Sequence, residues 1–407
     1  MLNFDIVNDV PTTNKTILLL TDLDVPIDNN SNILNDKKII RAMTTINYLV
    51  KTGARVVIAT HLGNPINESD VRFSTRPIAK YLDQRLCCEV KFCKTCIGDQ
   101  SRQEIFHSEY GDIVVLENLL FYEGEKNCDI NFANQLVEGI NIYVNDSFEY
   151  SRHNYASVLC APLFTKATIG LVFANEIKQL DKILDKTTNK TTTAIVGGEM
   201  KDKLYLLKNL VNQVKCIAVG GSVANNFLKS LGYSIGRSQF EPDCIDIAIT
   251  MFEEAKKNNC IFIIPEDVIV TSSTQQNKEL QMKKINEIET NDIIVDIGTK
   301  SAKNICDAVS ISNNVFFYGK ISANNIKNLE GEACVINKIA KLTENNQLFS
   351  IASEQETILS IQKNNCLDKF SFIPSSPDAT LQYMSGKILP GIEVLKRLSK
   401  QKIKTQT

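Results

Sequence analysis

A group of cysteines in the first quarter of the chain could support metal or redox chemistry. Its members are Cys87, Cys88, Cys93 and Cys96, the last two in a Cys-x-x-Cys arrangement. Thiolates at such spacing bind zinc or form redox pairs. Residues 90–93, however, alternate between apolar and polar types like a strand, and no second ligand pair follows at a distance. The pattern favours small apolar thiols in a protein core over a zinc site.

A loop with two glycines and nearby lysines is the second group that could support chemistry. Gly197 and Gly198 follow an apolar run, and Lys201 and Lys203 come shortly after them. A lysine that follows a strand and a Gly-Gly turn can contact a bound anion, whereas many loop lysines are simply solvated. Both interpretations stay open for Lys203.

The bulk composition restricts the classes of protein to which the chain can belong. Its 407 residues suffice for two domains, and 43% hydrophobic with 23% charged residues are ordinary for a globular enzyme. The formal net charge of −2 provides no attraction to nucleic acid or to an anionic membrane. The first residues lack the basic and apolar regions of a signal peptide, and no apolar run could span a membrane. We expect a cytoplasmic protein that binds neither nucleic acid nor membrane, with its twelve cysteines as free thiols.

Short apolar runs alternate with amphipathic helical stretches in both halves of the chain. The runs predict strands at residues 16–20, 54–60, 113–116 and 142–145, and again at 193–196, 216–219, 261–264 and 315–318. Strands separated by helices pair in parallel and are covered on both faces. The expected fold class is α/β, with two doubly wound parallel-sheet (Rossmann-like) domains joined by a helix. Ligands bind such sheets at the carboxyl ends of the strands, so we expect the active-site cleft between the domains.

Several segments share their order and spacing with one family of kinases. They are Asp22–Pro26, Thr60–Pro65, Leu116–Phe121, Tyr143–Phe148, Gly197-Gly198, Lys203, Gly220-Gly221, Pro265–Asp267, Val295–Gly298 and Gly386–Gly391. Each segment alone is a weak signal, but in order over nearly the whole chain they are a strong one. The chain thus resembles the phosphoglycerate kinases. A Rossmann dehydrogenase is disfavoured, because no Gly-x-Gly-x-x-Gly follows the first predicted strand.

The resemblance implies a reaction, its ligands and the roles of the domains. Phosphoglycerate kinases transfer a phosphoryl group between ATP, bound with Mg²⁺, and 3-phosphoglycerate in glycolysis and gluconeogenesis, and they are usually monomers. Residues 1–170 would form the 3-phosphoglycerate domain, 171–190 an interdomain helix and linker, and 191–385 the nucleotide-binding domain. Residues 386–407 would return to the N-terminal domain.

The resemblance also implies which residues lie in the two ligand sites. The substrate site corresponds to Asp22, Asp24, Lys38, His61, Asn64, Leu120, Arg152 and His153. The nucleotide site corresponds to Lys203, Gly220, Gly221, Asp296, Gly298, Gly319, Asn325, Glu356 and Thr357. Lys201 and Lys203 match the catalytic lysines, although the first of these falls on Met200 if the one-residue gap in the loop lies elsewhere. Glu356 either matches the carboxylate near Mg²⁺ or lies at the start of a surface helix without a role in binding.

The family's basic patch, which binds the anionic substrate, is largely replaced in this chain. The positions of the family's arginines hold Leu20, Asn64, Leu120 and His153, while Lys38 and His61 remain and Arg152 stands at the family's histidine. An arginine that binds carboxylate or phosphate with both nitrogens contributes roughly 1.5–3 kcal/mol. Asp24 replaces an asparagine and adds negative charge. Asp22 and Asp24 either bind substrate hydroxyls or form a polar exit from strand to loop.

The phosphate-binding turns of the nucleotide site are replaced as well. The family's Gly-Gly-Gly-Asp-Thr corresponds to Ser353–Thr357, so Glu354 brings both a side chain and a negative charge where backbone must approach phosphate. The family's Ser-Thr-Gly-Gly-Gly-Ala corresponds to Pro374–Ala379. This segment predicts a helix that caps itself, with Ser376 as N-cap, Pro377 in the first helical position and Asp378 in the first turn.

Two functions are compatible with this pattern. The chain is either a phosphoglycerate kinase with a patch rebuilt from Lys38, His61, Arg152 and His153, or a family member that has lost catalysis. In the second case it would act as a metabolite-binding or protein-interaction module.

The replaced arginines lead to a prediction about substrate affinity. We expect 3-phosphoglycerate to bind with a dissociation constant above about 1 mM. This value corresponds to a binding free energy of less than roughly 4 kcal/mol. Isothermal titration calorimetry of the purified protein measures this value directly. Micromolar binding would show that other basic residues have replaced the patch.

Overall fold

The computed structural model describes residues 4–66, 70–185, 190–272, 279–323, 326 and 329–406, with side chains as far as residue 399. These residues form two compact units. Unit 1 consists of Met1–Lys178 together with Ile388–Thr407, and unit 2 of Gln179–Lys387. The division falls inside helix α7 (Leu171–Leu184), so one helix contributes to both units. Within the described part of the chain, no helix is long and apolar enough to cross a membrane.

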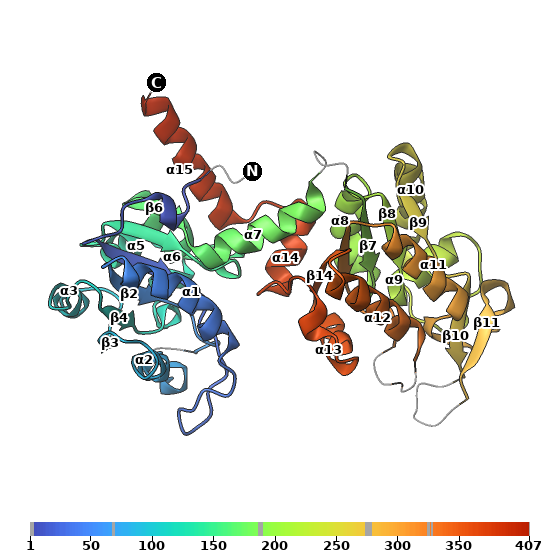
Figure 1. The fold of residues 1–407 in the computed structure, drawn as a ribbon, viewed down its shortest axis with the longest axis horizontal. Helices are drawn as coiled ribbons and strands as arrows, with labels where there is room; N and C mark the ends of the chain where they lie inside the picture. Colours follow the sequence, from blue (N-terminus) through green and yellow to red (C-terminus); the bar gives the residue numbers. More distant parts are fainter. Residues whose placement is uncertain are drawn as a thin grey trace. The chain divides into compact units, whose positions relative to one another are not determined.

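Unit 1 is built on a six-stranded sheet with the order β3-β4-β2-β1-β5-β6 (Figure 1). The strands are β1 (Thr16–Leu20), β2 (Arg55–Ala59), β3 (Val90–Cys93), β4 (Ile113–Leu116), β5 (Ile142–Asn145) and β6 (Lys166–Ile169). All neighbouring strands run parallel. The parallel arrangement that the sequence predicted for β1, β2, β4 and β5 is therefore confirmed.

Helices cover both faces of this sheet because its strands are apolar on both sides. Alternate residues of β1 belong to different hydrophobic clusters: Ile17 to one that includes Ile39 of α1 (Lys37–Lys51), and Leu18 to another that includes Phe132 of α5 (Ile130–Leu136). The remaining helices are α2 (Arg76–Asp83), α3 (Asp99–Phe106), α4 (Glu123–Lys126), α6 (Ala156–Leu159) and α15 (Pro390–Gln406). The C-terminal helix α15 packs against α6 and the short 3-10 helix η4 (Tyr150–Arg152).

Unit 2 contains a second parallel sheet with the order β14-β13-β7-β8-β9. Its strands are β7 (Thr192–Val196), β8 (Cys216–Val219), β9 (Ile261–Ile263), β13 (Asn314–Tyr318) and β14 (Phe349–Ser353). Its helices are α8 (Met200–Leu210), α9 (Gly221–Ser230), α10 (Ile245–Lys257), α11 (Thr299–Ser310), α12 (Gly331–Glu344), α13 (Gln355–Lys363) and α14 (Pro377–Met384). The second parallel sheet expected after residue 190 is thus present.

Unit 2 also contains a small antiparallel sheet that the sequence analysis did not predict. It consists of β11 (Gln281–Lys284), β10 (Asp267–Thr271) and β12 (Ile293–Ile297), in that order. Strand β11 is polar and largely exposed, so it lacks the apolar run on which the other predictions depended. Val268, Val270 and Ile288 form the small core beside this sheet.

Candidate functional site

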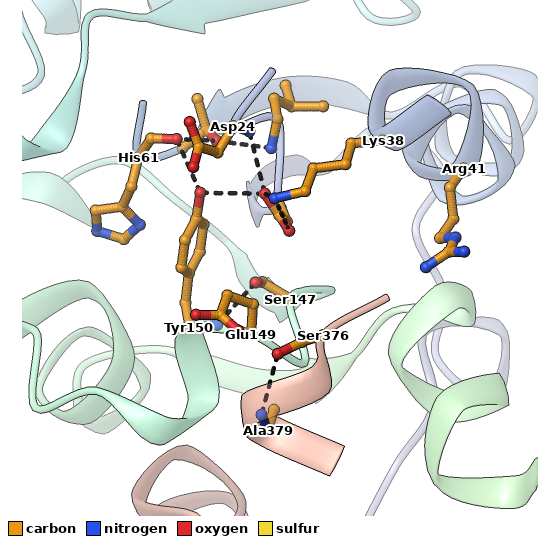
Figure 2. A network of polar contacts seen from close by, with 12 residues as sticks. Asp24, Lys38, Arg41, His61, Ser147, Glu149, Tyr150, Ser376 and Ala379 are labelled. Atoms are coloured by element: carbon orange, nitrogen blue, oxygen red, sulfur yellow. Dashed lines mark hydrogen bonds and ion pairs between the residues drawn. The ribbon is translucent and has the colours of Figure 1, made fainter. Parts of the chain in front are cut away.

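Lys38 and Asp22, both expected in the substrate site, form an ion pair in unit 1. Figure 2 shows Lys38 and the residues around it. Asp22 follows β1, and Lys38 lies in the first turn of α1. Lys38 Nζ lies 2.9 Å from Asp22 Oδ2 and 3.1 Å from Oδ1. The hydroxyl of Tyr150 lies 3.3 Å from Asp22 Oδ1 as well. Burial raises the pKa of Asp22, and the Lys38 ammonium opposes that rise. Lys38, one of the basic residues expected to bind an anionic substrate, is therefore already paired with a carboxylate of the same chain.

His61 lies in the interior of unit 1, in a buried hydrogen-bonded network. Its Nε2 lies 2.7 Å from Glu125 Oε1, and both side chains are almost completely buried. Glu125 also accepts hydrogen bonds from the hydroxyl and the backbone N–H of Ser157. The imidazole lies against the rings of Tyr150 and Tyr155, with centroids 4.2 and 4.7 Å away. This environment holds the ring in one orientation.

Arg152 and His153 share a single carboxylate partner. Arg152 donates from Nε and Nη2 to Glu149 Oε1 at 2.9 and 2.6 Å. His153 Nε2 lies 3.5 Å from the same oxygen. Sequence reasoning missed Glu149, although its spacing of three and four residues from Arg152 and His153 was a usable signal. Its charge offsets the basic groups that would attract an anionic substrate.

The remaining substrate-side residues differ widely in their surroundings. Asn64 is exposed, and Leu120 is buried with 8% of its surface exposed. Asp24 Oδ1 accepts a hydrogen bond from the backbone N–H of Gly63 at 2.8 Å, and the Asp24 N–H donates to Asp22 Oδ1. These backbone contacts are those of a polar exit from strand to loop, one of the two roles open from the sequence.

A cavity of about 450 Å³ lies in unit 2, where several strands end. Its wall includes residues after β7, β8 and β13 and residues of β10 and β12. Of the sequence candidates, Gly221, Asp296 and Glu356 line it. Leu228, Val268, Ile294, Val295 and Ile321 supply apolar surface, and Ser222, Asn225, Arg237, Gln239 and Lys320 supply polar groups. The wall is thus about as polar as it is apolar, and apolar surface combined with converging polar groups is compatible with a small-molecule site.

Lys203 and Glu354 form the closest ion pair of the nucleotide-side candidates. Lys203 lies in the first turn of α8, is almost completely buried, and places Nζ 2.6 Å from Glu354 Oε1. The ammonium also lies over the ring of Tyr318, 4.9 Å from its centroid. Burial raises the pKa of Glu354, while Lys203 opposes the rise. Lys203 thus contacts an anion, but the anion is a side chain of the same protein.

Glu354 also has an unusual backbone conformation. It is the N-cap of α13 with φ +78° and ψ 139°, a region that glycine tolerates and other residues rarely adopt. The conformation is therefore that of a glycine turn even though the residue is glutamate. The second oxygen of Glu354 is buried without a hydrogen-bond partner.

Most of the candidate glycines are explained by close packing within unit 2. A Cβ on Gly319 (φ +90°) would lie 2.2 Å from the carbonyl oxygen of Gly197, because β7 and β13 are paired neighbours. A Cβ on Gly220 would lie 2.3 Å from Cβ of Ile321, and one on Gly298 would lie 2.3 Å from Cγ of Asp267. These contacts give the glycines a structural role whatever ligand is bound.

Carboxylates of the chain occupy the starts of several helices in unit 2. Asp296 accepts hydrogen bonds from the first N–H groups of α12, Gly331 at 2.8 Å and Glu332 at 3.3 Å. Burial raises the pKa of Asp296 to about 7. Glu241 accepts from the Met200 N–H at the start of α8 at 3.0 Å. Sequence reasoning missed Glu241, because its distance of many residues from Met200 leaves no local signal.

The self-capped start of α14 is confirmed. Ser376 is the N-cap and its hydroxyl accepts a hydrogen bond from the Ala379 N–H at 3.0 Å, while Pro377 and Asp378 lie in the first turn.

In α13, Thr357 is buried and its hydroxyl has no hydrogen-bond partner. Lys201 is exposed on α8, and Asn325 lies outside the described residues.

Two cations of the cavity wall were missed from the sequence, Arg237 and Lys320. Lys320 is half-buried and donates from Nζ to the Ala323 carbonyl at 2.9 Å. Burial lowers the pKa of Lys320. No local pattern in the sequence indicated its position on the cavity wall.

The cysteine group expected in a core is buried only in part. Cys93 and Cys96 are buried, and Cys96 Sγ donates to the Glu117 carbonyl at 2.8 Å. Cys87 is exposed and Cys88 half-buried, so the expectation of buried thiols was wrong for Cys87. Across the residues that the structure describes, no three His, Cys, Asp or Glu side chains are grouped so that they could hold a metal.

Comparison with known proteins places this architecture in a family. A family model described as phosphoglycerate kinase matches residues 7–387. The phosphoglycerate kinase of Orientia tsutsugamushi (strain Boryong) is 33% identical over 398 residues, which are 97% of this chain and 98% of the relative. That of Wolbachia sp. subsp. Drosophila simulans (strain wRi) is 33% identical over 97% of this chain and 99% of its own. The solved phosphoglycerate kinase structure from Coxiella burnetii matches with a TM-score of 0.90 and 29% identity, over 97% of this chain and 100% of its own.

The fold is that of the two-domain α/β phosphoglycerate kinases. The chain belongs to the phosphoglycerate kinase family.

The raised pKa of Asp296 predicts how stability depends on pH. The folded state holds this proton up to about pH 7, whereas the unfolded chain releases it near 3.8. Protonated Asp296 contributes fully to the free energy of unfolding below the unfolded pKa. This contribution is lost as pH rises through 7, by at most about 1.4 kcal/mol per pH unit. We expect Asp296→Asn to remove this slope between pH 4 and 7, as measured by urea unfolding at each pH.

Asp267→Asn is the matched control for this measurement. Asp267 accepts from the Lys300 and Ser301 N–H groups at the start of α11. Burial raises its pKa, but hydrogen bonds from Ser301 and Lys300 outweigh burial and the net pKa is lowered. Its contribution to stability is lost only as the pH falls below about 3.8, so Asp267→Asn should leave the slope between pH 4 and 7 unchanged. Equal changes of the slope in the two variants would contradict the assignment of this slope to Asp296.

Proposed function

We propose that this chain catalyses the family reaction, phosphoryl transfer between ATP–Mg²⁺ and 3-phosphoglycerate, at a much reduced rate. Phosphoryl transfer needs positioning and charge neutralisation rather than covalent catalysis by the protein. The observation that carries the proposal is the contact between Lys203 and Glu354 at 2.6 Å. Lys203 keeps the position of a phosphate-contacting lysine, which supports the activity, and Glu354 competes for it, which lowers the rate.

The expected loss can be bounded from the groups that are replaced. A hydrogen bond to a charged group contributes about 1.5–3 kcal/mol, and about 1.4 kcal/mol changes a rate tenfold. Each missing contact therefore lowers the rate by roughly tenfold to a hundredfold. The losses are not additive, because the remaining groups act as a unit.

Mg²⁺ would be bound together with the nucleotide phosphates. Such ions use one or two carboxylates of the protein and take their other ligands from phosphate and water. Glu356 lies in the first turn of α13 and on the cavity wall, and its side chain would supply such a carboxylate. The ion would offset negative charge on the transferring phosphoryl group. Arg237 and Lys320, on the same wall, could neutralise further charge.

A catalytically inactive metabolite-binding or interaction protein is the second candidate. The self-capped α14 favours it, since Ser376 satisfies an N–H group at the helix start that could otherwise face a phosphate. In either case we propose a monomeric cytoplasmic protein with small-molecule ligands.

A coupled spectrophotometric assay with ATP, Mg²⁺ and 3-phosphoglycerate separates the two candidates. We expect a slow but saturable rate that depends on the concentration of each substrate and disappears in Lys203→Ala. A rate equal to the uncatalysed background, in both the unmodified protein and the variant, would favour the inactive candidate. A rate typical of kinases, of the order of 1–100 per second, would show that Glu354 does not hinder catalysis.

Replacing Glu354 tests the competition directly. Glu354→Gly removes the competing anion and relieves the backbone strain of about 1–3 kcal/mol, but it leaves Lys203 buried and unpaired. We expect a lower melting temperature without ligand and a clear rise when ATP–Mg²⁺ is added. Unmodified protein should barely respond to ATP–Mg²⁺.

Glu354→Gln is the matched comparison, because it removes the charge and keeps both the strained backbone and the bulk. We expect it to be less stable than Glu354→Gly and to respond weakly to nucleotide. A thermal shift of the unmodified protein with ATP–Mg²⁺ that is absent with Mg²⁺ alone would refute the competition.

A further inference from the structure

Two cysteine thiols of unit 1 lie in contact although they are distant in sequence. Cys128 follows helix α4 and Cys160 follows helix α6. Their Sγ atoms are 3.3 Å apart, and Cys160 Sγ lies 3.6 Å from the Cys128 carbonyl oxygen. Both residues are half-buried, so a small oxidant can reach them. The susceptibility of a thiol to oxidation follows its exposure and its thiolate character, and a second thiol within reach can convert the oxidised form to a disulfide.

The backbone holds both thiols in place. The Cys128 N–H donates to the Glu125 carbonyl, and the Cys160 N–H donates to the Ala156 carbonyl at 3.0 Å. A disulfide requires sulfur atoms about 2.05 Å apart, so closure needs a movement of roughly 1.3 Å, which side-chain rotation can provide. Another thiol pair, Cys306 and Cys334 between α11 and α12, is wider, at 4.0 Å.

We propose that Cys128 and Cys160 are a redox modification site that closes to a reversible disulfide. With hydrogen peroxide as oxidant, one thiolate attacks a peroxide oxygen, forms a sulfenic acid and releases hydroxide, which becomes water. The second thiol then attacks the sulfenic sulfur, the S–S bond forms, and a second water leaves. The two thiols lose two electrons and two protons in total, and the peroxide becomes two molecules of water. A dithiol reductant reverses the step by exchange.

The site is linked to the buried network around His61. Glu125 and Ser157, which hydrogen-bond to each other, each lie three residues before one of the cysteines. A disulfide would therefore fasten the same contact between α4 and α6 that orients His61. We expect the closed form to melt several degrees higher, because the bond constrains the unfolded chain. This inference depends on the fold and not on the proposed function.

Peptide mapping of the full-length protein tests the proposal. The reduced protein is incubated with a modest excess of hydrogen peroxide, alkylated and digested with trypsin. Trypsin cleaves after Lys126, Arg152 and Lys166, so Cys128 and Cys160 fall in separate peptides that contain no other cysteine. We expect these peptides to be joined, with the mass lowered by two hydrogens, and to separate after treatment with dithiothreitol. The melting temperature should rise on oxidation and return on reduction.

Two variants complete the experiment. Cys128→Ser should abolish the linked peptide and the thermal shift, whereas Cys306→Ser, which removes the other close pair, should leave both unchanged. If Cys128→Ser does not fold, Cys160→Ser and the map of the unmodified protein decide the question. Alkylation of both Cys128 and Cys160 after prolonged oxidation, or their separate conversion to sulfinic acids, would overturn the proposal.

Discussion

A buried charge needs a partner of opposite sign, and in this protein the partners come from the chain itself. An isolated charge is very unfavourable in a protein interior, so a lysine such as Lys203 cannot remain buried alone. Glu354 provides the carboxylate at 2.6 Å. Two more exposed ion pairs, Lys38 with Asp22 and Arg152 with Glu149, lie in unit 1. An anionic ligand could supply this negative charge when bound, whereas in the structure the side chains of the chain supply it.

The backbone around these pairs has kept the geometry of a glycine-rich site. Gly197 and Gly319 approach each other so closely that neither tolerates a side chain. Glu354, at the start of α13, has a left-handed φ of +78°, a conformation that glycine adopts more readily. Such a conformation costs about 1–3 kcal/mol for a residue with a Cβ. The surrounding strands impose it, and the ion pair with Lys203 helps to offset it.

The sequence predicted those parts of the structure that depend on local pattern. Strands β1, β2, β4 and β5 are continuous apolar runs between helices, and their parallel order follows from that alternation. The start of α14 was predictable because Ser376 and Pro377 act within one turn. Strand β11 was missed, since it is polar and exposed and forms only by pairing with β10.

The pairing of charges was less predictable than the fold, for the same physical reason. Glu354 was recognised as a repulsive group near phosphate, but its contact with Lys203 spans 151 residues and leaves no periodic signal. Glu241 reaches the start of α8 across 41 residues. Such contacts depend on which strands become neighbours and on side-chain rotamers. The burial of His61 against Glu125 likewise requires the three-dimensional arrangement of β2, α4 and α6.

An internal anion weakens ligand binding more than the loss of a contact would. A ligand phosphate that meets a free lysine gains the full interaction, whereas one that meets Lys203 must first displace Glu354. An intramolecular group held next to its partner acts at an effective concentration in the millimolar range or above. ATP at a comparable concentration does not displace Glu354 from Lys203 through its phosphates alone. Binding would have to draw on the apolar part of the cavity wall, which includes Leu228, Val295 and Ile321. Affinity in unit 2 would then depend on the uncharged part of the nucleotide, and the phosphates would contribute only after Glu354 moves away.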